Sequence, residues 1–563
     1  MPHRTINDLV RTANNLFPQG VGKAESVTMT AKRSEDVGHM HLQLFDIIII
    51  VLYATFVLVV SQYAGRAKGD EAADRPGFSA LQSRSLPWWA IGTSLIAANI
   101  SAEQIIGMSG SAYALGIAIA SYEWLAALVL LIVGKYFLPI FLKNQIHTMP
   151  EFLRRRYGRN TQIVMAVFWI GLYIFVGLTS ILWLGATAVH VVTGLTLTAS
   201  LILLGLFAGN YALTVGLKAV AVTDVVQVSM LVLGGLVIAY ISLERISGGS
   251  GFGGLVDGFH ILSTRLPEHF HLILDPSNPY YKYIPGIGVL LGGMWIVHLS
   301  YWGFNQNIIQ RALTAKSIRE VQKGVVLAAF LKLLIPVLVV LPGIAAAILV
   351  PQLGRSDEAY PNVMTLLPSG VLGFVFVALV AAIIASMGSA LSSIATIFTV
   401  DIFKVARKQT SDRQLVIVGR FAAIFALALA MLTAMPLLGH FDQAFQYIQE
   451  YNGFFTPGIT VIFLLGMFWH RATEKGALVA AIGAPFISLG YWIFQPQVPF
   501  LNRMGYVFLI CLTAAVVVSL LDRSKAQKSS IEVRGLDFST SMGFNLAGVV
   551  LVLILIALYA MWW

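Results

Sequence analysis

The fold is decided by the stretch Ala97-Ala98-Asn99-Ile100-Ser101-Ala102-Glu103-Gln104, which lies inside a long apolar segment. Polar groups at membrane depth are costly unless they are paired, hydrated or functional. We predict that a membrane-spanning helix is interrupted here, because a break that frees backbone carbonyls is tolerated only where it lines a cavity. Close packing of small residues against another helix is the alternative. Packing accounts for the alanines and Ser101 but leaves Glu103 and Gln104 unexplained.

The composition of the whole chain places it in a membrane. Of the 563 residues, 57% are hydrophobic and 11% are charged, compared with about 45–50% and about 25% in soluble domains. These values exclude soluble, collagen-like, disordered and nucleic-acid-binding proteins. The net charge of +10 needs no acidic ligand, because the cytoplasmic loops of membrane proteins are rich in lysine and arginine. The single cysteine, Cys511, excludes an intrachain disulfide.

Apolar runs of about 20 residues, the length that spans a bilayer, predict an all-α integral membrane protein with about fourteen helices. No remaining segment is long enough for a separate soluble domain. Residues 1–43 lack the apolar region of a signal peptide, so we expect a flexible tail or a short surface helix there. The predicted spans are 44–64, 87–113, 115–142, 161–192, 196–213, 218–243, 285–311, 323–350, 369–402, 413–438, 445–469, 475–494, 501–521 and 544–563.

The distribution of basic residues predicts the orientation. Lysine and arginine gather in the loops 143–159, 311–323 and 404–413, and short cytoplasmic loops retain such residues. The three loops are therefore expected on one side, the cytoplasm, with both termini on the outer side. This arrangement predicts a multi-pass protein of the cell membrane, or of the inner membrane if the source is bacterial.

Three isolated charges lie within predicted spans. Glu123 and Lys332 are far from the ends of their helices, and a carboxylate and an ammonium in one hydrated cavity reduce each other's cost. Both groups also bind the polar groups of sugars or amino acids. Partial snorkelling is an alternative for Lys332. Asp224 lies near the cytoplasmic end of its helix, where an ordinary interfacial carboxylate is an equally good interpretation.

Two further polar clusters complete the pattern. The segment 295–306 combines Trp295, His298 and Tyr301 with Gly303 and Asn305, which favours a second interrupted helix over an interfacial aromatic belt. Glutamines at 443, 446 and 449 indicate a polar helix face, or else a helix start outside the membrane.

The two interrupted helices stand five positions apart, as expected for two inverted five-helix repeats of a secondary transporter. The predicted organisation is an extra helix at 44–64, repeats at 87–243 and 285–469, and three additional helices in 475–563.

Several strings of the sequence resemble the solute:sodium symporter family, over about residues 44–563. The resemblance is closest to the sodium/galactose and sodium/glucose branch of that family, whose fold is leucine-transporter-like. The strings are residues 86–111, Ser121-Tyr122-Glu123-Trp124, Gly134-Lys135-Tyr136-Phe137-Leu138-Pro139, Ile309-Gln310-Arg311, Thr399-Val400-Asp401-Ile402 and Phe445-Gln446-Tyr447-Ile448-Gln449-Glu450-Tyr451.

The resemblance implies a set of sugar-site residues. Amide, carboxylate and ammonium groups match the hydroxyls of a pyranose, and an aromatic side chain matches its apolar face. Ala126 stands where the galactose type has a serine, and His298 stands where it has an asparagine. The implied substrate-binding residues are Gln104, Glu123, His298, Tyr301, Lys332 and Gln449, with Tyr301 stacking on the ring as an inner gate. The implied gate residues are Asn99, which holds Tyr301, and the hydrophobic Met108, Tyr122 and Phe445.

The resemblance also implies a sodium site. Its ligands are the carbonyls of Ala97, Ile100 and Ala382 and the hydroxyl of Ser386, oxygen ligands that suit a hard cation. The family has two adjacent serines where this chain has Ala385-Ser386, so Ser389, a carbonyl or water is expected to replace one hydroxyl. Asp224 matches a carboxylate that the family uses for sodium passage toward the cytoplasm.

We therefore expect a sodium-coupled importer of a hexose, galactose or glucose, that works by alternating access. Sodium, the sugar and membrane lipid are the expected partners, with no other cofactor and no nucleic acid. A proton-coupled or uncoupled carrier of a related polyol is the alternative, motivated by Ala385 and His298. An intramembrane enzyme using Glu123 and Asp224 lacks the zinc, nucleophile-elbow and phosphate-loop motifs. A transporter-like sensor would need a signalling domain, which the sequence does not contain.

Overall fold

The computed structural model describes residues 41–53, 55, 87–146, 148–214, 217–313, 315–407, 409–522, 531, 533 and 535–563; the side chains of residues 211–226, 307 and 412 lie outside the description. The described residues form helices and no β-strand. The tail 1–40 and most of the second half of the predicted 44–64 helix lie outside the described residues, whereas Leu44–Tyr53 is helical.

Ten described helical stretches are long and apolar enough to cross a membrane, and the helices Leu44–Tyr53 and Leu197–Asn210 are shorter apolar segments. The chain is a multi-pass membrane protein. The helices are α5 (Trp88–Asn99), α6 (Met108–Leu115), α7 (Ser121–Ile132), α8 (Leu138–Lys143), α9 (Met149–Arg156), α10 (Arg159–Leu172), α11 (Thr179–Thr193), α12 (Leu197–Thr214), α13 (Leu217–Ser247), α14 (Gly251–Arg265), α15 (Gly288–Leu291), α16 (Gly293–Phe304), α17 (Gln306–Ala312), α18 (Ile318–Leu349), α19 (Ala359–Thr365), α20 (Val371–Thr396), α21 (Lys404–Ala406), α22 (Asp412–Leu438), α23 (Ala444–Phe468), α24 (Glu474–Phe494), α25 (Phe500–Leu521) and α26 (Met542–Met561).

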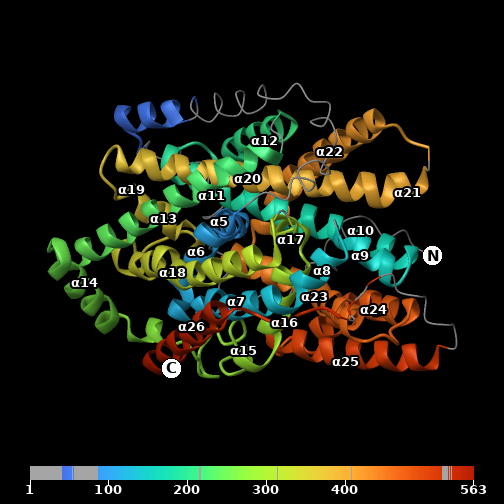
Figure 1. The fold of residues 1–563 in the computed structure, drawn as a ribbon. Helices are drawn as coiled ribbons and strands as arrows, with labels where there is room; N and C mark the ends of the chain where they lie inside the picture. The colour runs from blue at the N-terminus through green and yellow to red at the C-terminus, as the bar shows by residue number, and fades with distance from the viewer. Residues whose placement is uncertain are drawn as a thin grey trace, which may run out of the picture.

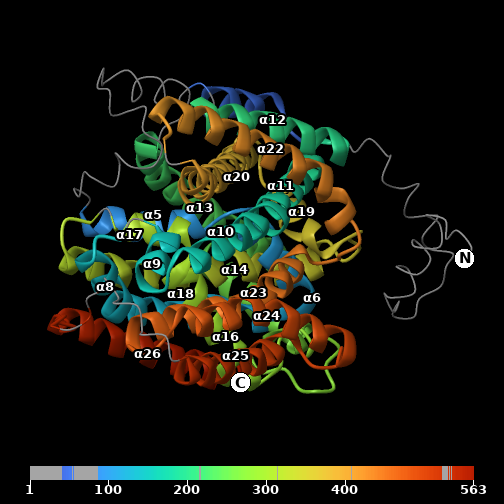
Figure 2. The same cartoon turned by 90° about the vertical axis from the view of Figure 1, so that its right-hand side faces the viewer.

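The long helix α18 lies near the centre of the bundle. It packs against α5, α6, α7 and α13. In both views, α12 and α22 lie on one side of the bundle and α25 and α26 lie on the opposite side, with α18 and α23 between them (Figures 1 and 2). The helices around α18 therefore occupy the interior, where polar side chains are shielded from lipid.

The basic loops gather at one end of the bundle. Figure 1 shows α9 and α21 at the right-hand end and α14 at the left-hand end. Arg159 donates to the carbonyl of Val405 at 3.1 Å, and the backbone N–H of Met149 donates to Oε1 of Gln306 at 2.8 Å. The loops 143–159 and 404–413 therefore lie in contact, and the start of α17, which precedes the loop 311–323, contacts the first of them.

The N-terminal helix is fastened to α20 through Asp46. The Asp46 carboxylate is buried and accepts hydrogen bonds from the backbone N–H groups of Gly370 at 2.6 Å and Gly373 at 2.8 Å. These donors lie at the start of α20, where helix N–H groups lack partners within the helix. A Cβ atom at Gly373 would lie 2.6 Å from Cα of Asp46, so only glycine permits this close approach.

A sharp turn joins the first interrupted segment to the next span. Gly116, at the end of α6, has φ +71°, a conformation that glycine adopts without steric cost. A Cβ atom there would lie 2.3 Å from the carbonyl oxygen of His269. The turn packs directly on the segment after α14, at the end of the bundle opposite the basic loops.

Candidate functional site

The first predicted interruption is present between α5 and the π-helical turn Glu103–Gly107. α5 ends at Asn99, and Ile100 has the extended backbone angles φ −72° and ψ 100°. The N–H of Glu103 then donates to Oγ of Ser101 at 3.2 Å, so the serine caps the restarting segment. A helix that ends here leaves its last carbonyls without helical partners.

The second predicted interruption lies at Asn305, between α16 and α17. Asn305 has φ −82° and ψ 126°, an extended conformation between two helices. The two broken segments are joined because Arg311 of α17 donates to the hydroxyl of Ser94 in α5 at 2.8 Å and to its carbonyl at 3.2 Å.

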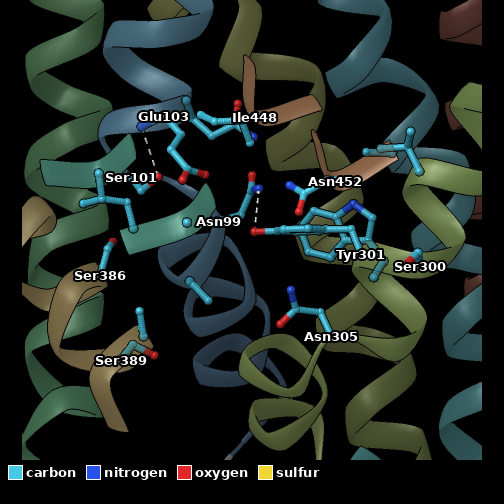
Figure 3. A pocket seen from close by; sticks show the side chains of 18 of the residues that line it. Asn99, Ser101, Glu103, Ser300, Tyr301, Asn305, Ser386, Ser389, Ile448 and Asn452 are labelled. Atoms are coloured by element: carbon cyan, nitrogen blue, oxygen red, sulfur yellow. Dashed lines mark hydrogen bonds between the residues drawn. The ribbon is translucent and has the colours of Figure 1, made fainter. Parts of the chain in front are cut away.

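A cavity of about 200 Å³ lies between the two breaks. Figure 3 shows Asn99, Ser101 and Glu103 facing Tyr301 and Asn305 across it, with Ser386 and Ser389 on another helix. The cavity lining includes Asn99, Gln104, Tyr122, Glu123, His298, Tyr301, Lys332, Phe445 and Gln449 from the predicted sugar site and gates, and Ala97, Ala382 and Ser386 from the predicted sodium site.

A chain of polar contacts crosses the cavity. Nζ of Lys332 lies 2.5 Å from Oε2 of Glu123 and also donates to Oδ1 of Asn99. The amide nitrogen of Asn99 in turn donates to the hydroxyl of Tyr301 at 3.2 Å. Lys332 also lies 5.0 Å from the ring centroid of Trp302, a distance typical of cation–π contacts. The ammonium therefore has three kinds of partner.

Aromatic rings line the cavity near the start of α23. Tyr122 makes edge contacts with Phe445 and His298, with ring centroids 5.1 Å and 6.1 Å apart. Met108 is fully buried in the same region of the chain as the first break. In the other direction, the lining reaches Asn305 and Arg311, next to the basic loop that follows α17.

Three buried polar atoms of cavity-lining residues have no hydrogen-bond partner among the described residues. They are Oε1 of Gln104, Nε2 of His298 and the hydroxyl of Tyr122. Buried polar groups are nearly always hydrogen-bonded, so unpaired groups beside a cavity indicate a polar occupant. A ligand that both donates and accepts hydrogen bonds fits these atoms.

The residues of the implied sodium site are divided between α5 and α20. Ala97, Ala382 and Ser386 line the cavity, together with Ala385 and Ser389. Ile100 lies at the break itself and lines a small adjacent cavity with Gln104. The side-chain oxygens available on this part of α20 therefore belong to Ser386 and Ser389, one helical turn apart.

Two of the expected residues lie outside the lining of the main cavity, and the side chain of a third is not described. Met108 and Ile100 do not line the main cavity. Asp224 lies in α13, but its side chain is outside the described part of the structure, so its predicted role stays a prediction.

Many of the residues that line the cavity were not assigned a role from the sequence, among them Glu103, Trp302, Arg311 and Asn452. A signal for Asn452 was present, because it follows Gln449 by three residues and therefore lies on the same helix face. Trp302 was visible only as part of an aromatic cluster, and its place beneath Lys332 depends on how α16 meets α18.

The family follows from comparison with known proteins. The model of the sodium:solute symporter family matches residues 80–483. The chain belongs to this family. Its members are transporters.

Curated relatives in this family are similar over most of the chain. A sodium/glucose cotransporter from Vibrio parahaemolyticus is 45% identical, over 93% of this chain and 99% of the relative. Mouse sodium/myo-inositol cotransporter 2 is 34% identical, over 78% of this chain and 68% of the relative. Rabbit sodium/glucose cotransporter 1 is 30% identical, over 85% and 79%.

Solved structures show the same fold. The substrate-bound, outward-open structure of a Na⁺-coupled sialic acid symporter aligns with TM-score 0.70 and 21% identity, covering 86% of this chain and 99% of that one. The nucleobase-cation-symport-1 family transporter Mhp1 in a closed conformation aligns with TM-score 0.51 and 15% identity, covering 81% and 97%. The predicted leucine-transporter-like fold is confirmed.

Proposed function

We propose that this chain is a sodium-driven symporter that imports a hexose, galactose or glucose. The observation that carries the proposal is the buried Glu123–Lys332 pair, set beside the unpaired Gln104 and His298 atoms in a cavity between two broken helices. The 45% identity to a sodium/glucose cotransporter supports the sodium coupling and the sugar class.

The sugar would bind through hydrogen bonds from its hydroxyl groups. Glu123 and Lys332 offer an acceptor and a donor, and Gln104 and Gln449 each offer both. Tyr301, held by Asn99, presents a ring for the apolar face of the sugar. His298, with its Nε2 unpaired, supplies one further donor or acceptor.

Sodium would bind between α5 and α20. The carbonyls of Ala97, Ile100 and Ala382 and the hydroxyl of Ser386 are the proposed ligands, with Ser389 as the nearest available second hydroxyl. Two elements that move relative to each other would then be held together by the ion. Asp224 is proposed to assist sodium passage toward the cytoplasm.

Transport would proceed by alternating access. Met108, Tyr122 and Phe445 are proposed to cover the cavity at one end, and at the other end its lining includes Arg311, next to the basic loop that follows α17. If the basic loops are cytoplasmic, as the positive-inside rule predicts, this conformation faces inward. A membrane potential of about 100 mV contributes about 2.3 kcal/mol per sodium ion, enough for roughly fifty-fold accumulation.

We propose the same organisation of the chain that the sequence predicts. Residues 87–243 and 285–469 would form the inverted repeats, 44–64 an extra helix and 475–563 three additional helices, after a tail at 1–43. Both termini would face outward across the cell membrane, or the inner membrane in a bacterium.

Uptake into liposomes tests the function. Purified protein is reconstituted, and uptake of radiolabelled galactose and glucose is measured with an inward sodium gradient and with sodium replaced by choline at fixed pH. We expect accumulation only with sodium. Unchanged uptake in choline would reject sodium coupling and favour the proton-coupled or uncoupled alternative. Competition by a panel of sugars and polyols then defines the substrate.

Two glutamine variants test the sugar site. Gln104→Ala and Gln449→Ala are each expected to reduce uptake strongly while the protein still reaches the membrane. Gln495→Ala is the matched control, because Gln495 is exposed beyond the end of α24. Normal uptake in both cavity variants would contradict the assignment.

A further inference from the structure

The last helix, α26, packs against the two helices that carry the Glu123–Lys332 pair. Its main neighbours among the described helices are α7, which carries Glu123, and α18, which carries Lys332. Figure 1 shows α26 beside α7. Most residues of α26 are exposed or half-buried, and the helix lies outside residues 80–483, the part that the family model matches. A helix from outside the matched part therefore covers the pair's two helices on one side.

Two aromatic residues at the end of α26 make contact with the start of α7. The hydroxyl of Tyr559 donates to Oγ of Ser121 at 3.1 Å. The ring of Tyr559 also makes an edge contact with Trp124, with ring centroids 6.2 Å apart. Trp562, just beyond the helix, stacks on Trp124 with ring centroids 6.3 Å apart and planes inclined by 13°. These are the separations and arrangements that aromatic pairs prefer, so a hydrogen bond and two ring contacts join α26 to the first turn of α7.

The first turn of α7 faces two ways. Tyr122 and Glu123 line the cavity. Ser121 and Trp124 are buried and do not line it, and they are the residues that contact α26. Because the four residues are consecutive in one helical turn, a movement of Ser121 and Trp124 also moves the carboxylate of Glu123.

The segment before α7 is a 3₁₀ turn, Gly116–Ala120. The hydrogen bonds of a 3₁₀ turn have poorer geometry than those of an α-helix, so contacts from other elements matter more for the start of α7. The end of α26 is itself anchored, because the carbonyl of Trp562 accepts from the N–H of Leu272 at 2.7 Å. An anchored aromatic pair therefore lies against the turn that carries Glu123.

We propose that Tyr559 and Trp562 are positioning residues for sugar binding. They do not line the cavity; they hold Ser121 and Trp124 so that the first turn of α7 presents Glu123 to the sugar in the correct orientation. Hydrogen bonds depend steeply on distance and angle, so a small shift of this turn weakens the contacts with the sugar while the helix bundle stays folded. The inference rests on the proposed sugar site and adds residues of the last helix to it.

Uptake kinetics of the purified, reconstituted protein test the role of the hydrogen bond. Tyr559→Phe removes the donor and Ser121→Ala removes the acceptor. We expect each variant to raise the galactose or glucose concentration for half-maximal uptake by up to about tenfold, with little change in the maximal rate. The double variant should be no worse than either single variant, because both remove the same hydrogen bond. Tyr506→Phe is the matched control, because Tyr506 of α25 is 49% exposed.

A second set of variants tests the ring contact. Trp562→Ala should also raise the sugar concentration for half-maximal uptake, and Trp562→Phe, which keeps a ring, should restore part of the loss. Trp563→Ala is the control, because Trp563 is exposed. Equilibrium binding of ²²Na⁺ without sugar should stay at the wild-type value in every variant, because the proposed sodium ligands belong to α5, the first break and α20.

Wild-type half-saturation in Y559F, S121A and W562A would overturn the proposal. A loss of sodium binding in the same variants would overturn it as well, because α26 would then serve only the stability of the fold. An absence of sodium-driven galactose and glucose uptake in the wild-type protein would instead reject the proposed function, and this inference with it.

Discussion

The Lys332 ammonium lies 2.5 Å from the Glu123 carboxylate, although the two residues are 209 positions apart in the chain. Each side chain is only 1% exposed. Two charges at membrane depth are tolerated because each supplies the counter-charge of the other. The pair also joins α7 to α18 beside the cavity, so it links helix packing to the proposed sugar site.

Breaking this pair should destabilise the protein. Lys332→Ala or Glu123→Ala leaves one buried charge unpaired, which costs about 3–5 kcal/mol in comparable pairs. We expect each single variant to unfold at a lower temperature than the double variant, while all three lose sugar uptake. Thermal unfolding of the purified proteins measures this. Lys323→Ala, in a pair whose lysine is 60% exposed, is the control and should change little. Additive losses in the double variant would show that the charges do not depend on each other.

Removing the hydrogen bond on the gate tyrosine should weaken transport moderately. Tyr301→Phe keeps the ring and deletes only the hydroxyl that accepts from Asn99. One neutral hydrogen bond is worth about 0.5–1.5 kcal/mol, so sugar affinity should fall by about twofold to tenfold. Tyr301→Ala removes the stacking ring as well and should abolish measurable uptake. Concentration-dependent uptake in liposomes distinguishes the two, and equal losses would argue against stacking.

Restoring the second serine should strengthen sodium binding. Ala385 lines the cavity beside Ser386, so Ala385→Ser adds one oxygen where the family carries a hydroxyl. We expect the sodium concentration for half-maximal uptake to fall by about tenfold, or about 1.4 kcal/mol. Ser386→Ala should raise it. Ser389→Ala reports whether that hydroxyl replaces the missing one, and an unchanged sodium dependence in A385S would place the ion elsewhere.

The proposed cover at the end of the cavity opposite the basic loops should respond to pH through Asp357. This residue lies between α18 and α19, and its carboxylate accepts from the N–H of Ala444 at the start of α23. Next to it, Ser356 donates to Asp442 through its N–H at 2.9 Å and its hydroxyl at 2.6 Å. Burial raises the pKa of Asp357 well above its usual value; Asp442 and Glu358 raise it further, and Arg355 and the Ala444 N–H oppose the shift.

The raised pKa of Asp357 determines how closure of the cavity should depend on pH. A raised pKa in the closed form means that the closed form holds the proton more tightly than an open, hydrated form. Protonated Asp357 therefore stabilises the closed form. This stabilisation is complete below the pKa that Asp357 has in the open form, and it is lost as the pH rises through the higher pKa that Asp357 has in the closed form. With Cys511→Ala removing the single cysteine, Met108→Cys should react faster with an impermeant thiol reagent as pH rises. Adding Asp357→Asn should remove this dependence, and a pH profile that survives D357N would assign it to another group.

Much of the architecture was predictable from local sequence. The polar run around Asn99 and Ser101 predicts a break because an unbroken lipid-facing helix would not tolerate it. The cluster ending at Asn305 does the same for α16. Glu123 and Lys332 were recognisable because charges are rare at membrane depth. Each of these features was recognisable within a single segment of sequence, because polar and charged side chains are costly in the apolar interior of a bilayer.

The tertiary structure decided which of these groups meet. Gln446 and Gln449 lie on the same predicted helix face, yet only Gln449 lines the cavity. Trp302 beneath Lys332, Arg311 on Ser94 and the contact of Ser356 with Asp442 join segments far apart in the chain. Such contacts depend on how the helices pack, which hydropathy does not encode. The sequence alone determined the membrane class, the two helix breaks and the charges at membrane depth. Packing determined that Glu123 has a partner and that Glu103 has none among the described residues. The reason is that pairing depends on the distance between side chains in space, which the sequence does not specify.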